Sequence, residues 1–247
     1  MTTEVLLREL QRDPAGVAAL ADRGDVRVQR RDAEPLLLLR EDRAHAAADG
    51  ALAAARALRV ALLHLDEAAP EALTGEFPWV TRLPVDDRRR FVGEFAQAVQ
   101  ASAELGQWDV LAQALQEWRA TAGIHADPAL AAELSRPLED DLGPVPVPEG
   151  NPAGPGGWEP RFATSEAAKG WEELCRVVAT PMEEAWAVVA GRPARRRHGL
   201  RGRLAEREIG GRTLRQWQYE VPGEGRIWYC RDAERRVAWV VAAWRMR

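Results

Sequence analysis

The C-terminal part of the sequence carries the residues whose types and spacing fit chemistry on a polyanion. Three arginines precede a histidine in the run Arg195-Arg196-Arg197-His198, and more arginines follow at intervals. Guanidinium groups neutralise phosphate charge and bind phosphate oxygens through paired hydrogen bonds. From Gly191 onward the chain has 15 basic and 6 acidic groups, a net charge of +9. We therefore expect this part to bind a polyanion.

The remainder of the chain has the opposite sign. Residues 1–157 carry 16 basic and 26 acidic groups, a net charge of −10, whereas residues 158–247 carry 18 and 12, a net charge of +6. One interpretation is that the acidic part lies against the basic part in place of a polyanion. The alternative is that two unrelated solvated surfaces differ in sign.

Length and composition set the broad class. A chain of 247 residues with 46% hydrophobic residues is long enough for two domains with proper cores. It has no run of about 18 apolar residues, which predicts no membrane span. It also lacks an N-terminal export signal, so we expect a cytoplasmic protein.

Histidine and cysteine spacing gives no support for a metal site. His45, His64 and His125 each lack a second ligand one helical turn away. Cys175 and Cys230 have neither metal-ligand nor disulfide-framework spacing, and both fall on apolar stripes, which favours buried free thiols. We expect no metal and no cofactor.

The N-terminal residues 1–40 predict a strand, a helix and a hairpin. Thr2 to Leu7 favours a strand, and the helix restarts at Asp13-Pro14, a good cap and first-turn pair. Gly24 ends the helix, and alternation at Val26 and Val28 begins the hairpin, which returns at Leu36–Leu39.

Residues 41–136 predict a helical region. Apolar periodicity indicates helices over 41–65, 86–105, 108–121 and 128–134, with a loop anchor at Phe77-Pro78-Trp79. Residues 137–160 are rich in proline and glycine, which predicts a linker.

Residues 161–247 predict two helices followed by an antiparallel sheet. Thr164 and Thr180 are candidate N-caps for helices over 165–178 and 180–190. A strand is expected near Leu200 to Glu208, followed by a three-stranded meander over 214–244. Alternation of Trp217 and Tyr219 with Gln216 and Gln218 predicts one buried and one solvated face. The fold class is α+β, with a four-stranded antiparallel C-terminal sheet.

The N-terminal region resembles the N-terminal domain of Phd/YefM antitoxins. The resemblance covers about 45 residues and rests on Leu7-Arg8-Glu9-Leu10, Asp13-Pro14, Val17, Ala21, Arg23-Gly24-Asp25, Val26, Val28, Arg30-Arg31 and Pro35-Leu36. It implies dimerisation through the sheet and contacts with operator DNA. The DNA-binding candidates that follow from it are Arg8, Arg12 and Arg27; the alternative is that they are solvated surface residues.

The C-terminal region resembles the RelE/ParE toxin superfamily over about 85 residues. The likeness rests on Ala167-Ala168-Lys169-Gly170-Trp171, Leu200-Arg201-Gly202, Gln216 to Val221 and Gly225-Arg226-Ile227-Trp228-Tyr229. It implies that basic side chains neutralise a scissile phosphate while a 2′-hydroxyl attacks it. The catalytic candidates implied are Arg226 first, then Arg201, His198, Arg245 and Arg247. The RNA-binding candidates are Arg195, Arg196, Arg197, Gln216 and Gln218.

Two features depart from the family pattern. Gln216 and Gln218 stand where active relatives often have lysines, and the chain ends at Arg247, before a tail that can supply a tyrosine. Tyr229 lies on the other register of its strand and is expected in the core.

Both resemblances together predict a single-chain type II toxin-antitoxin protein. Its antitoxin half would mask a RelE-like, ribosome-dependent mRNA endoribonuclease and could regulate its own transcription. Its partners would be its own antitoxin half or a second copy in a homodimer, operator DNA, and mRNA on the ribosome. The alternatives are an inactive toxin fold that serves as a regulator or protein-binding module, and gyrase inhibition without RNA cleavage.

Overall fold

The computed structural model describes residues 3–31, 33–65, 68–138, 157–192, 194, 196–222 and 225–245. The chain forms two compact units: Met1–Ala61 with Val99–Trp108, and Leu62–Ala98 with Asp109–Arg247. This division differs from the boundaries expected at 41 and 161, because most of the helical region joins the C-terminal sheet. The expected linker 137–160 falls largely outside the described residues.

The first unit has the predicted strand, helix and hairpin. Asp13 Oδ1 accepts a hydrogen bond of 2.9 Å from Gly16 N, so the helical stretch breaks and restarts where the Asp-Pro pair predicts. Strand β1 pairs in parallel with β2, and β2 pairs antiparallel with β3. Val26 and Val28 are buried with Val17 and Ala21. The elements are β1 (Thr3–Leu6), α1 (Leu7–Arg12), α2 (Pro14–Arg23), β2 (Val26–Gln29), β3 (Leu36–Leu38) and most of α3 (Glu41–Leu65).

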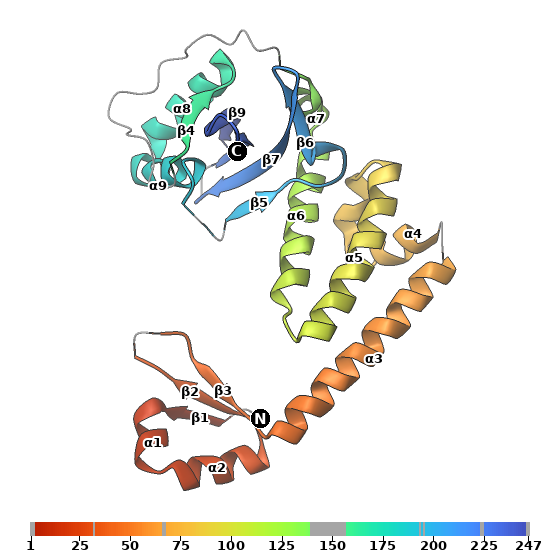
Figure 1. Ribbon diagram of the computed structural model, residues 1–247, viewed down its shortest axis with the longest axis vertical. Coiled ribbons are helices and arrows are strands. Elements are labelled where there is room, and N and C mark those ends of the chain that lie inside the picture. Colours follow the sequence, from red (N-terminus) through yellow and green to blue (C-terminus); the bar gives the residue numbers. More distant parts are fainter. Residues whose placement is uncertain are drawn as a thin grey trace. The chain divides into compact units, whose positions relative to one another are not determined.

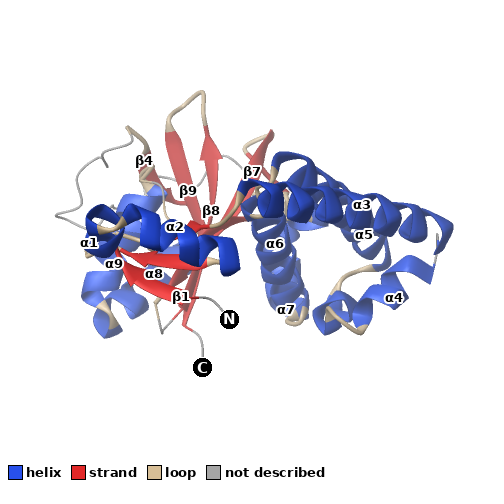
Figure 2. Ribbon diagram, turned by 90° about the horizontal axis from the view of Figure 1, so that it is seen from below, coloured by secondary structure: helices blue, strands red, loops and turns tan. Residues whose placement is uncertain are grey.

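The second unit is a sheet with helices on both faces (Figures 1 and 2). Helices α8 and α9 pack on one face, and α6 and α7 cover the other. The helices are α4 (Ala69–Thr74), η2 (Pro78–Arg82), α5 (Val85–Leu105, in this unit up to Ala98), α6 (Asp109–His125), α7 (Pro128–Ser135), α8 (Ser165–Val177), α9 (Ala179–Val189) and η3 (Gly202–Leu204). The strands are β4 (Glu159–Phe162), β5 (Arg197–Gly199), β6 (Glu206–Ile209), β7 (Arg212–Val221), β8 (Gly225–Asp232) and β9 (Val237–Arg245).

The meander β7-β8-β9 is antiparallel as predicted, but the sheet is larger than the expected four antiparallel strands. Its order is β4-β9-β8-β7-β5, with β6 also paired to β7, and β4 runs parallel to β9. The mixed orientation arises because the strand that precedes the two helices joins the edge at β9. That strand falls at the end of the stretch expected to be linker.

The strand expected over Leu200 to Glu208 is interrupted. Gly202 has a φ of +59°, and the turn it begins separates β5 from β6. A glycine adopts this left-handed conformation without the penalty that a side chain would add.

Of the two N-caps predicted in the C-terminal region, the one at Thr164 is confirmed and the one at Thr180 is wrong. Thr164 caps α8 by accepting a hydrogen bond of 3.0 Å from Ala167 N. Helix α9 begins at Ala179 rather than at Thr180, with Val178 as its N-cap residue and no side-chain cap. Gly170 lets α8 approach β9 closely, since a Cβ there would lie 2.0 Å from the Ala243 carbonyl oxygen.

Candidate functional site

The face of the sheet that was expected to be solvated is covered by helices α6 and α7, here called the covering helices. Ile124 and Leu134 from these helices pack against Trp228, Cys230 and Trp239 of the sheet, and all of these side chains are buried. The contact is therefore an apolar core rather than a purely ionic one. Burial of this kind contributes about 25 cal/mol per Å² of apolar surface.

A partly buried ionic contact joins α6 to the loop after β5. Arg201 lies 2.5 Å from Glu117 Oε2 through Nη2 and 3.0 Å from Glu94 Oε2 through Nη1. Thr121, one turn after Glu117, accepts a hydrogen bond of 2.9 Å from Arg201 N. Glu117 also accepts a hydrogen bond of 3.2 Å from Gly199 N. Helix α6 thus accepts hydrogen bonds from two backbone N–H groups of this segment and also pairs with the Arg201 guanidinium.

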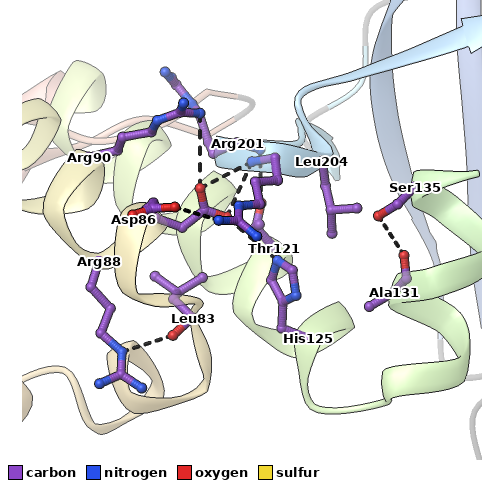
Figure 3. Close-up of polar contacts among 12 residues, drawn as sticks. Leu83, Asp86, Arg88, Arg90, Thr121, His125, Ala131, Ser135, Arg201 and Leu204 are labelled. Atoms are coloured by element: carbon purple, nitrogen blue, oxygen red, sulfur yellow. Dashed lines mark hydrogen bonds and ion pairs between the residues drawn. The ribbon is translucent and has the colours of Figure 1, made fainter.

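A second contact joins α5 to the same loop. The buried Asp87 carboxylate accepts hydrogen bonds of 3.1 and 3.2 Å from Arg203 N, and the Arg203 side chain pairs with Asp86. A Cβ on Gly202 would lie 2.4 Å from the Asp87 carboxylate carbon, so only glycine lets the two segments meet this closely. Figure 3 shows Asp86, Arg201, Thr121 and His125 gathered at this contact.

His125 completes this group from α6. Its Nε2 atom lies 3.6 Å from Asp87 Oδ2, and its side chain is 12% exposed. Burial lowers the pKa of His125 most, the charge of Arg203 adds to this, and Asp87 opposes it. His125 is therefore part of a packed polar contact with Asp87 and Arg203.

A third contact fixes α7. The Arg207 side chain is fully buried on β6. It donates a hydrogen bond of 2.7 Å to the Glu133 carbonyl oxygen and one of 2.9 Å to the Arg136 carbonyl oxygen, both at the C-terminal end of α7. A cation at this end also interacts favourably with the helix dipole. Burial lowers the pKa of Arg207.

Arg226 lies in a cleft of about 910 Å³ between α6, η2 and residues of strands β5, β7 and β8. A Cβ on Gly123 of α6 would lie 3.4 Å from Arg226 Nη1, so the guanidinium rests against the helix. We expected acidic side chains to cover Arg226, but the residues that line the cleft are mainly basic. The basic groups that line it are Arg82, Arg119, Arg196, Arg226 and His198; Trp79, Gln116 and a single carboxylate, Glu220, are also present.

A neighbouring cleft of about 580 Å³ shares His198 and Gln116 with the first. Arg197 lies over the ring of Trp217, 4.7 Å from its centroid, and Arg215 lies 5.0 Å from the same centroid. Two guanidinium groups thus lie close enough to the Trp217 ring for cation–π contacts.

Gln216 and Gln218, expected to contact RNA, are instead fully buried. Gln218 Oε1 accepts a hydrogen bond of 2.9 Å from Trp228 Nε1, and Gln216 Nε2 donates 3.1 Å to the Leu204 carbonyl. In this arrangement neither side chain can reach a ligand, because the covering helices occupy that face. Tyr229 is buried in the core on the other face, as expected.

The remaining candidates are dispersed. Arg8, Arg12 and Arg27 are exposed on the first unit, where Arg27 pairs with Glu4 at 3.6 Å. Arg245 is exposed at the end of β9, where it pairs with Gly225, and it lines a different pocket from Arg226. Arg195 and Arg247 lie outside the described residues.

Sequence reasoning missed the acidic partners and the basic residues of the covering helices. Glu117, Thr121 and His125 recur every four residues and so share one stripe of α6, while Gln116, Arg119 and Gly123 form the stripe beside it. This polar stripe on a helix that also carries core residues was the available signal. The aromatic group of Phe77, Trp79, Phe91, Phe95 and Trp118 positions η2 and α5 beside it.

We searched the described part of the chain for metal-ligand groups and for membrane-spanning helices. It contains no group of three or more histidine, cysteine or carboxylate side chains placed to hold a metal ion. Nor does any helix within it have the length and apolar character to cross a bilayer. The chain matches no protein-family model, and no curated protein or solved structure matches it.

Proposed function

We propose that the chain is a single-chain toxin-antitoxin protein in which the helical region keeps a RelE-like module covered. The observation that supports this most directly is the contact of Arg201, a residue of the RelE-like motif, with Glu117 and Glu94. An acidic partner supplied by the same chain neutralises a guanidinium that would otherwise attract phosphate. In the next turn of the loop, Asp86 pairs with the Arg203 guanidinium in the same way, and Asp87 accepts a hydrogen bond from the Arg203 backbone nitrogen.

The apolar part of the cover determines how it would be released. The covering helices share a core with the sheet, so their removal exposes Trp228, Cys230 and Trp239 as well as charged groups. A tether raises the local concentration of the cover into the millimolar range, which further disfavours release. Activity is therefore expected only after the covering helices are removed or degraded, and not from a brief opening.

The released module would cleave mRNA on the ribosome with Arg226, assisted by His198 and Arg201. The first unit would bind operator DNA through Arg8, Arg12 and Arg27 and would pair with a second copy. These roles rest on the two family resemblances.

Expression of residues 158–247 tests the activity. This fragment should arrest growth and cut ribosome-bound mRNA, and co-expression of residues 1–157 should restore growth. Arg226→Ala in the fragment is the matched control and should abolish cleavage. Because the fragment lacks its apolar cover, its folding must be checked by circular dichroism. A folded fragment that leaves growth and mRNA unchanged would contradict the proposal.

A second candidate function is a regulator built on an inactive toxin fold. The burial of Gln216 and Gln218 favours it, because these side chains stabilise the covered sheet at positions where active relatives often have lysines. The full-length chain would then bind DNA or a protein partner, and the folded fragment would cut no mRNA.

A further inference from the structure

The basic cleft joins cationic residues from two sides of one contact. Arg82 comes from η2 and Arg119 from α6. On the other side, Arg196 directly precedes β5 and Arg226 is on β8. None of these four guanidinium groups is paired with a carboxylate among the residues that the structure describes. Glu220 is the one carboxylate in the described lining, and its Oε1 lies 3.5 Å from Gln218 Nε2.

Two neighbouring stripes of α6 present opposite charges to the sheet. Glu117 on α6 meets Arg201 with a carboxylate, yet Arg119, two residues later, lines the cleft that holds Arg226. A helix that only neutralised the sheet would offer acidic groups to both arginines. Placing like charges in one cleft without a counter-charge is unfavourable; Arg226 is partly buried, and Arg82, Arg119 and Arg196 are exposed at its mouth to an incoming ligand. The arrangement is accounted for if an anion binds between them.

The chemistry of the lining indicates a phosphate-bearing anion. Guanidinium groups bind phosphate oxygens in bidentate fashion, and four of them match a chain of phosphates rather than one carboxylate. The volume of about 910 Å³ falls within the range of small-ligand sites. Trp79 and Gln116 add a ring and an amide on the α6 and η2 side, which could contact an organic group attached to the phosphates.

We propose that this cleft binds a small polyphosphorylated anion of the nucleoside triphosphate class, held between α6 and the sheet. The ligand contacts both the covering helix and the sheet, so it binds the covered state and stabilises it. This goes beyond the proposed function and requires no cleavage activity. It depends only on the covered arrangement, so it can hold even if the module cuts no RNA.

The test uses the full-length chain at low ionic strength, with calorimetric titration and thermal unfolding. The probes are inorganic tripolyphosphate, ATP, AMP and a single-stranded RNA of about twelve nucleotides. Tripolyphosphate and ATP should bind saturably and raise the Tm, and AMP should bind more weakly. Tighter binding of ATP than of tripolyphosphate would place the nucleoside in the cleft, whereas equal affinities would assign recognition to the phosphates alone.

Two variants locate the site. Arg119→Gln and Arg226→Gln should each weaken tripolyphosphate binding at least about tenfold, because each removes charge-assisted hydrogen bonds. Without ligand, each should keep or raise the Tm, since one of several like charges is gone. Arg161→Gln is the matched control; Arg161 is exposed on β4, pairs with Glu159, and should leave affinity unchanged.

Three outcomes would overturn the proposal. The first is no saturable binding of tripolyphosphate or ATP. The second is equal affinity in the two cleft variants and the Arg161→Gln control. The third is binding of RNA alone, which would assign the cleft to a nucleic-acid strand instead.

Discussion

Arg201 and Glu117 are 84 positions apart, yet the Nε and Nη2 atoms of the arginine lie 2.6 and 2.5 Å from the same carboxylate oxygen. The Glu117 side chain is 1% exposed and that of Arg201 is 28% exposed. The other carboxylate oxygen of Glu117 accepts from Gly199 N. One side chain of the covering helix α6 therefore contacts both the end of β5 and the first residues of the loop that follows it.

Replacing Glu117 by glutamine should destabilise the second unit by about 2–3 kcal/mol, because Arg201 would keep its partly buried charge with only Glu94 as partner. The free energy of unfolding can be measured in urea with tryptophan fluorescence as the signal, since nine of the ten tryptophans belong to the second unit. Glu159→Gln is the control. Its pair with Arg161 is about half exposed, so the loss should stay below about 1 kcal/mol. Equal losses in both variants would contradict the role given to Glu117.

Gly202 and Gly211 form a matched pair for testing the contact with α5. Both have positive φ, +59° and +71°, but a Cβ on Gly202 would meet Asp87, whereas a Cβ on Gly211 would meet nothing within 4 Å. Gly211→Ala should cost only backbone strain, about 1–2 kcal/mol. Gly202→Ala should cost at least about 1 kcal/mol more, because the carboxylate must also leave Arg203 N. Similar unfolding midpoints for the two variants would show that Asp87 does not hold the loop.

Local features of the chain were predictable where a few neighbouring residues determine them. The Asp13-Pro14 pair, the Thr164 cap and the alternation of Val26 and Val28 all act within one turn or one strand. The bounds of α3 followed from its apolar periodicity alone. These signals depend on short-range sterics and hydrogen bonds, which the sequence contains directly.

The covered face of the sheet was not predictable in this way. Gln216 and Gln218 alternate with apolar residues as a solvated face would, yet α6 and α7, from about 80 positions earlier in the chain, bury both. Whether a glutamine faces water or a distant helix depends on tertiary packing. The charge asymmetry left contact between the parts as one of two interpretations, and it did not predict that Arg226 would share a cleft with Arg119 while Arg201 paired with Glu117.

His125 should make the stability of the second unit depend on pH. Burial, the largest cause, and Arg203 keep its folded pKa below the ordinary value of 6.5, and Asp87 only partly compensates. The unfolded chain therefore takes up the proton first, so stability is full above about pH 6.5 and falls as pH decreases below it. In His125→Gln this fall should be smaller between about pH 6.5 and 5. His45→Gln is the control, because His45 is exposed on α3. An unchanged pH slope in His125→Gln would refute the assignment.

Cys230 offers a direct measure of how firmly the covering helices hold. It lies on β8 beneath them with no exposed surface, and burial raises its pKa to about 12. The thiolate is the reactive form, so a thiol reagent at about pH 8 should modify Cys230 only when the cover opens. In a Cys175→Ser background, which removes the other thiol, labelling should be slow in the native chain and fast in denaturant.

The labelling rate should also follow the stability of the ionic contacts around Arg201. If Glu117→Gln costs about 2–3 kcal/mol in the opening step, labelling should accelerate roughly 30- to 150-fold, since each 1.4 kcal/mol is a factor of ten when opening and closing are rapid. Glu159→Gln should leave the rate unchanged, because that carboxylate is on the exposed edge strand β4. Acceleration by tenfold or more in the first variant alone would tie the cover to Arg201. Rapid labelling of the unmodified native chain would instead mean that the covering helices leave the sheet readily, and then Glu117 could not be what keeps the loop after β5 in place.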